Sequence, residues 1–149
     1  MSKELTLTMT IDQARACNEA LELYSRVCIG QIDRIEDLVR MGVIPLGGER
    51  SERKEASMET CNAVESILKS VKVVLGYTAN GSSGIGNPHV HITAHRTWEM
   101  KKVISKALAE DRNPNAAHRG VDYDGLSVRC TTDPAPVAVV IDRSSASQK

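Results

Sequence analysis

The sequence predicts an α+β fold, in which a small antiparallel sheet packs with two long antiparallel helices and a third, shorter helix. Three observations support this prediction. A helical pattern of about thirty residues follows the N-terminal segment, a second helical pattern follows a short linker, and apolar residues alternate with polar ones near both ends. The 149 residues are enough for one domain with its own core.

The N-terminal strand is predicted by Leu5, Leu7 and Met9, which alternate with threonines at the period of a half-buried strand. Thr10 then fits a helix N-cap, and Gln13 three residues later completes a capping box. The strand therefore leads directly into the first helix.

The first helix is predicted as one continuous element over residues 10–40, because its apolar positions recur every three or four residues. These positions are Ala14, Cys17, Leu21, Tyr24, Cys28, Ile32, Ile35 and Val39. Such a helix is about 45 Å long, longer than a compact domain of this size needs, so we expect an oligomer. Gly30 lies within it and is expected to allow close approach of another backbone.

The remaining elements follow after a linker. Ser51 can cap a second helix, and a third helix is predicted from Thr93 to Glu110. Alternating residues over 126–130 and an apolar run over 137–141 predict a C-terminal hairpin. The second helix has its apolar positions at Met58, Cys61, Val64, Ile67, Leu68, Val71 and Leu75. We therefore expect one ligand-binding domain over residues 1–142 and a disordered tail over 143–149.

The charge balance and the cysteines narrow the function classes. Nineteen basic and nineteen acidic residues give zero net charge, which disfavours a nucleic-acid binder or an anionic-membrane binder. No apolar stretch reaches the length of a membrane span. The four cysteines form no CxxC pair, so a reduced, cytoplasmic protein is expected.

A glycine-rich loop, residues 81–86, precedes the third helix. Glycines let the backbone approach a ligand, and N–H groups near a helix start bind phosphate. The loop lacks the Gly-Lys-Ser/Thr of a Walker loop, and a helix rather than a strand precedes it, which excludes a dinucleotide fingerprint. An ordinary flexible connector has the same composition.

Histidines and the single tryptophan surround the start of the third helix. His89, His91 and His95 would share a face on a strand or a helix, but no carboxylate or cysteine completes a metal site there. Their alternative role is the polar rim of a pocket. Trp98 has core spacing, yet beside Arg96 it could stack on a base next to a neutralised phosphate.

The segment over residues 112–124 is rich in side chains that recognise ligands. Arg119 could hold a phosphate through two hydrogen bonds, and Asp122 or Asp124 could accept ribose hydroxyls or an adenine amine. A solvated loop with an Asp-x-Asp-Gly turn is the alternative. No nucleophile with its base is recognisable, so the sequence favours a binding protein without metal, cofactor or enzymatic activity.

The run over residues 20–31 resembles a helical motif of small phage proteins, the type 1 Thoeris anti-defense family. Residues 84–87, 97–108 and 121–124 are similar to that family's second half, so the resemblance extends from Leu5 to Ile141. It implies a sponge in the cytoplasm of an infected bacterial host. Such a protein binds a cyclic ADP-ribose isomer, in some members also cyclic oligonucleotides, and assembles as dimers and hexamers.

The resemblance also implies a binding site. It assigns the base or phosphates to the backbone of Ser83, Gly84 and Ile85, the diphosphate to Arg96 and Arg119, base stacking to Trp98, and a ribose or amine to Asp122. The chain departs from the family because serine occupies the loop position where an aromatic residue is expected. Tyr77 or Trp98 would have to replace that ring.

Two other functions remain open. The histidine cluster with Asp122 could belong to a metal-dependent hydrolase of such signals. Alternatively, the helical seam could bind a host protein, and no ligand pocket would exist. A sponge returns its ligand intact after denaturation, whereas a hydrolase does not.

Overall fold

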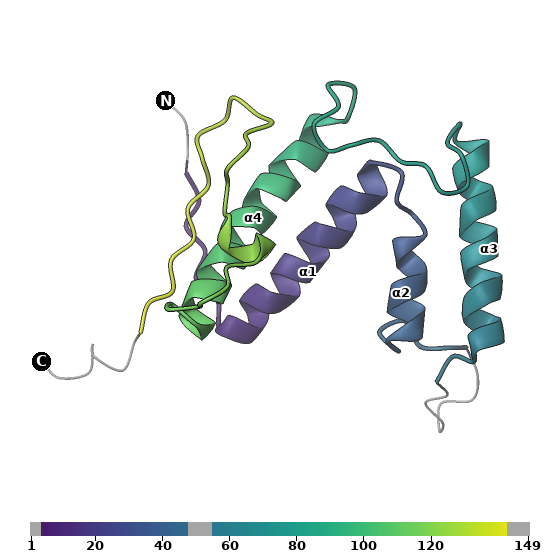
Figure 1. The fold of residues 1–149 in the computed structure, drawn as a ribbon, viewed down its shortest axis with the longest axis horizontal. Coiled ribbons are helices and arrows are strands. Elements are labelled where there is room, and N and C mark those ends of the chain that lie inside the picture. The colour runs from purple at the N-terminus through teal and green to yellow at the C-terminus, as the bar shows by residue number, and fades with distance from the viewer. Residues whose placement is uncertain (1–3, 48–54, 143–149) are drawn as a thin grey trace, which may run out of the picture. The chain divides into compact units, whose positions relative to one another are not determined.

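The structure, a computed structural model, describes residues 4–47 and 55–142, and the described residues form helices connected by irregular segments (Figure 1). The predicted α+β fold is wrong, because no strand occurs anywhere in these two ranges. The elements in chain order are α1 (Ile11–Cys28), α2 (Arg34–Arg40), α3 (Met58–Val74), α4 (Ile92–Arg112) and the 3₁₀ turn η1 (Val121–Tyr123).

The segments predicted as strands have the composition of strands but lack partners. Leu7 is 68% exposed, Val137 85% and Val139 72%, so their apolar faces cover nothing. Near the predicted hairpin, the backbone N–H groups of Cys130 and Thr131 donate to a side chain instead of to a neighbouring strand. An alternating pattern forms a strand only where a second strand takes its backbone groups, and here a carboxylate takes two of them.

The predicted first helix is interrupted at Gly30, which corrects the single element expected over residues 10–40. Gly30 has φ +90°, which ends α1. Its N–H donates to the carbonyl of Val27, and the N–H of Gln31 donates to the carbonyl of Arg26, which together form a Schellman motif. The glycine therefore turns the chain into the separate helix α2.

The N-termini of α1 and α3 are capped by side chains. The predicted capping box is confirmed, since Thr10 and Gln13 exchange hydrogen bonds of 2.9 and 3.2 Å at the start of α1. Ser57 rather than Ser51 caps α3, with its Oγ accepting from the N–H of Thr60 at 3.1 Å. Ser51 lies outside the described residues.

The chain divides into two compact units, one formed by Met1–Glu22 with Arg96–Lys149 and the other by Leu23–His95. We call them the terminal unit and the central unit. The boundaries fall within α1 and α4, so each of these helices contributes to both units. The single ligand-binding domain over residues 1–142 stays a prediction, and the tail over 143–149 lies outside the described residues.

In the central unit, α2 and α3 pack side by side and antiparallel (Figure 1). Lys72 near the end of α3 donates to Asp33 just before α2 at 2.9 Å, and the lysine residue is only 1% exposed. The second predicted helix therefore packs against the short α2, not along one long first helix.

In the terminal unit, the part of α4 after Arg96 runs antiparallel to the part of α1 before Leu23. Ser105 donates to Asn18 at 3.0 Å, and Lys101 pairs with Glu22 at 2.7 Å. The third helix was predicted over 93–110 and occurs over Ile92–Arg112, but with 21 residues it is the longest helix described, not a shorter one.

The described core is small and unusually polar. Its buried apolar residues are Ile29, Val39, Cys61, Ala94 and Ala109. Its buried polar residues are Ser25, Glu36, Lys72, His95, Glu99, Lys102 and Ser105. Because buried polar groups are costly unless they are hydrogen-bonded, paired side chains rather than a large apolar core position the loops.

Within the described ranges, none of the helices combines the length and apolar character needed to cross a membrane. All four cysteines are free thiols, and Cys61 is the fully buried one.

Candidate functional site

The predicted ligand-binding residues divide between the two units. Ser83, Gly84 and Ile85 belong to the central unit, whereas Arg96, Trp98, Arg119 and Asp122 belong to the terminal unit. Each group is therefore described within its own unit.

The glycine-rich loop of the central unit is tied to the end of α1. The N–H of Ser83 donates to the carbonyl of Ile29 at 2.8 Å, and the side-chain amide of Gln31 donates to Ser82 Oγ at 3.2 Å. The Ser83 N–H predicted to meet a phosphate is thus already used by the protein. Gly84 has open space where a Cβ would lie, and Ile85 is half-buried.

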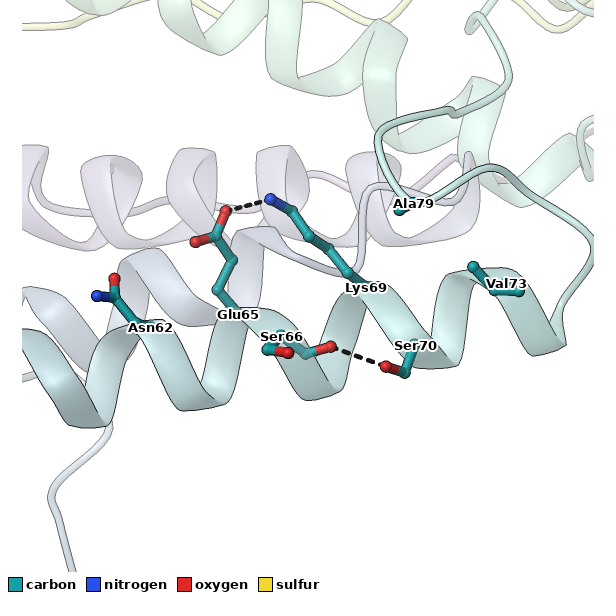
Figure 2. Close-up of a pocket in the computed structure, with 7 residues that line it drawn as sticks. All are labelled: Asn62, Glu65, Ser66, Lys69, Ser70, Val73 and Ala79. Carbon is teal, nitrogen blue, oxygen red and sulfur yellow. Dashed lines mark hydrogen bonds and ion pairs between the residues drawn. The ribbon is translucent and has the colours of Figure 1, made fainter.

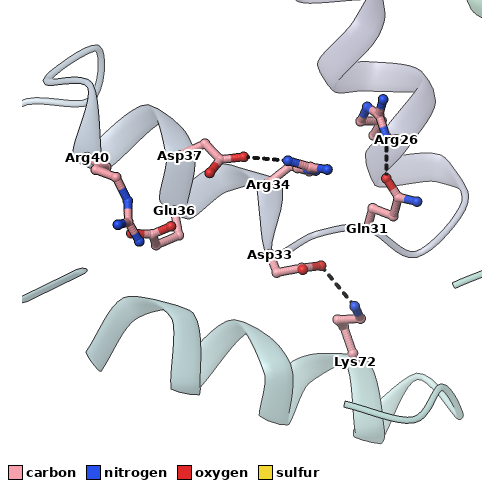
Figure 3. A network of polar contacts seen from close by, with 8 residues as sticks. All are labelled: Arg26, Gln31, Asp33, Arg34, Glu36, Asp37, Arg40 and Lys72. Atoms are coloured by element: carbon pink, nitrogen blue, oxygen red, sulfur yellow. Dashed lines mark hydrogen bonds and ion pairs between the residues drawn. The ribbon is translucent and has the colours of Figure 1, made fainter. Parts of the chain in front are cut away.

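The loop thus contacts the C-terminal end of the run over residues 20–31, part of which is drawn in Figure 3. Arg26 donates to Gln31 at 2.8 Å across the end of α1. The ring of Tyr77 lies over Gly30, so that a Cβ at the glycine would be 2.6 Å from Tyr77 Cζ. Gly30 therefore admits an aromatic ring, not the second backbone that the sequence suggested.

Charged side chains of α2, which follows this end of α1, pair with one another. Glu36 accepts two hydrogen bonds from Arg40, and Arg34 pairs with Asp37 at 3.0 Å (Figure 3). Burial alone would raise the pKa of Asp33, but the hydrogen bond from Lys72, a backbone hydrogen bond and the charges of Lys72 and Arg34 together hold that pKa below its ordinary value. The network is internally paired, which indicates a structural role.

The terminal unit is organised by Glu99, a carboxylate only 2% exposed on α4. It accepts hydrogen bonds of 2.8 Å from the N–H of Cys130, from the N–H of Thr131 and from Thr131 Oγ1. Burial alone would raise the pKa of Glu99, but these hydrogen bonds lower it below the ordinary value. Glu99 thus fixes the chain that follows η1.

Arg96 strengthens the same attachment. Its Nε lies 2.6 Å from Asp133 Oδ2, and the pair is partly exposed. The hydrogen bond from Arg96 lowers the pKa of Asp133. Arg129 also donates to the Asp133 carbonyl, so both arginines hold residues 129–133 in place.

Arg119 lies in the loop between α4 and η1. It pairs with Glu110 at 3.0 Å, and its guanidinium lies 5.1 Å from the centre of the Tyr123 ring. The helical rise from Arg96 to Glu110 is about 21 Å, so the two arginines of one chain are not placed for one diphosphate. Asp122 is exposed in η1, next to Tyr123 and close in sequence to Arg119.

A groove of about 330 Å³ lies beside Glu110, and we call it the α4 groove. Lys106 and Glu110 form its charged edge, 3.9 Å apart, and Arg119 pairs with the same Glu110. Its other lining residues are Val103, Ala107, Gly125, Leu126, Pro136, Val137 and Ala138. The groove thus combines mostly apolar lining residues with one lysine–glutamate pair, and Arg119 adjoins this pair through Glu110.

A second groove of about 360 Å³ follows one face of α3 in the central unit, and we call it the α3 groove (Figure 2). Lys69 and Glu65 pair across it at 2.8 Å, and Ser70 donates to the Ser66 carbonyl. The remaining lining residues are Asn62, Val73 and Ala79. This groove is polar and offers one lysine, already paired.

The histidines do not assemble a metal site in the described residues, where no group of three or more potential ligands is found. His91 Nδ1 accepts from the N–H of Thr93 at 3.3 Å, at the beginning of α4. His95 is 7% exposed and its Nε2 lacks a hydrogen-bond partner among the described residues. Trp98 is half-buried on α4.

Sequence reasoning missed the residues that shape the terminal unit. Lys106 and Glu110 were not singled out, although with Val103 and Ala107 their spacing places them on one face of a helix. Glu99 was missed because no local sequence pattern predicts that a carboxylate will accept hydrogen bonds from backbone N–H groups about thirty residues away.

No protein-family model, curated protein or solved structure matches this chain.

Proposed function

We propose that this protein binds a cyclic nucleotide signal of the cyclic ADP-ribose class in the α4 groove and sequesters it without degrading it. The proposal draws on the resemblance of residues 20–31, 84–87, 97–108 and 121–124 to anti-defense sponges. It relocates the site to one groove of the terminal unit. The loop N–H of Ser83, which the resemblance assigned to the ligand, serves the protein itself.

The observation that carries the proposal is the shared acid at the edge of the groove. Glu110 faces both Lys106 and Arg119, at 3.9 and 3.0 Å. A phosphate that enters the groove can replace this carboxylate as the partner of two cations at once. The Tyr123 ring beneath Arg119 keeps the guanidinium in place during that exchange.

The remaining features of the groove fit the rest of such a ligand. Its apolar floor offers contact to a base, and exposed Asp122 offers a carboxylate to ribose hydroxyls. Complementarity to the bound molecule itself, without groups that stabilise a transition state, is what sequestration requires.

The test incubates the purified protein with a cyclic ADP-ribose isomer, filters the mixture, heats the retained fraction and analyses both fractions by chromatography. We expect ligand to be depleted from the filtrate and recovered intact after heating. Recovery of a hydrolysed product would establish a hydrolase instead. Ligand that stays free and unchanged would exclude this class of signal.

Variants locate the site. Arg119→Ala and Lys106→Gln should each weaken binding roughly ten- to hundredfold, since each removes one charged hydrogen-bond donor. Lys69→Gln is the matched control, because Lys69 forms the same kind of i, i+4 pair with Glu65 in the α3 groove. Weakening by Lys69→Gln but not by Lys106→Gln would move the site to the α3 groove and contradict the proposal.

A further inference from the structure

One face of α3 carries an apolar stripe that nothing in the central unit covers. Ile67 is 64% exposed, Val71 42% and Val74 86%, and Val64 and Thr60 on the same face are partly exposed. At 100° per residue these five side chains fall within a sector of about 80°. The packing with α2 uses a different sector, which contains Cys61 and Lys72.

The spacing of this stripe is that of a coiled-coil seam. From Thr60 through Val64, Ile67 and Val71 to Val74 the steps alternate between four and three residues. Each of the five residues is β-branched, so the side chains are stiff and project regularly. A helix that packs only within its own chain does not need such a seam on its open side.

We infer that this seam binds the same seam of a second copy of the chain. The charge distribution favours a copy over a different partner. The seam and its flanking positions, which include Ala63 and Ser70, carry no charge, and Lys69 and Glu65 on another side of α3 neutralise each other. The chain has zero net charge, so two copies do not repel one another.

The pattern is also suited to a two-fold contact. Thr60 and Val74 have nearly the same shape and lie at equal distances from Ile67 along the helix. A two-fold axis beside Ile67 therefore sets one β-branched surface against itself, as an isologous interface requires. This inference does not depend on the ligand proposed above.

One seam about 21 Å long is smaller than a standard interface of about 800 Å² per partner. The association should therefore be reversible and should weaken on dilution. We expect sedimentation equilibrium of the wild-type chain to give a mass that rises with concentration from 16.2 kDa towards twice that value. A mass of 16.2 kDa at every concentration up to about 200 μM would overturn the inference.

The variants test the face itself. Ile67→Glu and Val71→Glu should remain at the mass of one chain at concentrations where the wild type associates. Val73→Glu is the matched control, because Val73 is 56% exposed on the same helix but points about 140° away from the seam. Circular dichroism verifies that each variant keeps its helices. A wild-type association that survives Ile67→Glu, or is lost equally in Val73→Glu, would place the interface elsewhere.

Discussion

At the scale of single residues, Gly30 decides where α1 ends and what lies beside that end. Two requirements coincide there: φ of +90° and the Tyr77 ring in the space of a Cβ. Gly42 has only the first of these: its φ is +68°, but the space for a Cβ is open. An alanine at Gly42 would therefore meet backbone strain without a ring contact. The two glycines therefore separate backbone strain from ring contact.

We expect Gly30→Ala to lower the free energy of unfolding by more than Gly42→Ala. Each substitution costs about 1 kcal/mol for the left-handed backbone, and Gly30→Ala also displaces the Tyr77 ring. Urea denaturation of both variants measures the difference. Equal losses would show that the ring contact at Gly30 is unimportant, and Tyr77→Leu in the Gly30→Ala background should recover part of the loss.

Glu99 is the second deciding residue, because its depressed pKa makes stability depend on pH. A carboxylate whose pKa is lower in the folded chain than in the unfolded chain stabilises the fold at pH values above its unfolded-state pKa. This contribution is lost as the pH falls through its folded-state pKa. For Glu99 the ordinary value is 4.5, so wild-type stability should decline below about pH 4.5.

Glu99→Gln should lower the free energy of unfolding at pH 7 by about 2 kcal/mol, because three charge-assisted hydrogen bonds lose their charge. It should also flatten part of the decline in acid. Thermal melts between pH 7 and pH 3 measure both effects, with the exposed Glu19→Gln as the control. An unchanged pH profile in Glu99→Gln would show that Glu99 does not contribute to the acid sensitivity.

At the scale of elements, the α2–α3 pair depends on one unequal ion pair. Lys72 is fully buried, whereas the side chain of Asp33 is 32% exposed. Removal of the acid leaves a buried ammonium without its partner, while removal of the lysine leaves a carboxylate that water can reach.

Asp33→Ala should therefore destabilise the protein by about 3 kcal/mol, whereas Lys72→Met, which keeps the volume of the side chain, should change stability by less than about 1 kcal/mol. Chemical denaturation followed by circular dichroism measures both. If Lys72→Met proved the more damaging variant, the lysine would contribute through more than its pair with Asp33.

At the scale of the whole molecule, self-association through α3 links stability to concentration. A dimer of folded chains stabilises the fold by mass action, so the melting temperature of the wild type should rise with protein concentration. Ile67→Glu should melt at one temperature over the same range, and Val73→Glu should follow the wild type. A wild-type melting temperature independent of concentration would argue against coupling between assembly and folding.

The sequence determined the features that depend on near neighbours. The capping box of Thr10 and Gln13 and the extent of α4 follow from residues within a few positions of one another, and both were predicted correctly. The break at Gly30 was locally encoded too, but it was interpreted as a helical glycine instead of a helix end.

The tertiary structure decided the features that depend on distant residues. The alternating segments near both ends fit a sheet, yet Glu99 took the backbone groups of residues 130 and 131 and no strand formed in the described chain. Similarly, Arg96 and Arg119 both suit a phosphate, but Arg96 pairs with Asp133 near the start of α4, whereas Arg119 pairs with Glu110 near the end of that helix. Local sequence patterns indicate which secondary structures and contacts a segment can form. Competition for hydrogen-bond partners and charged partners across the fold decides which of them it forms.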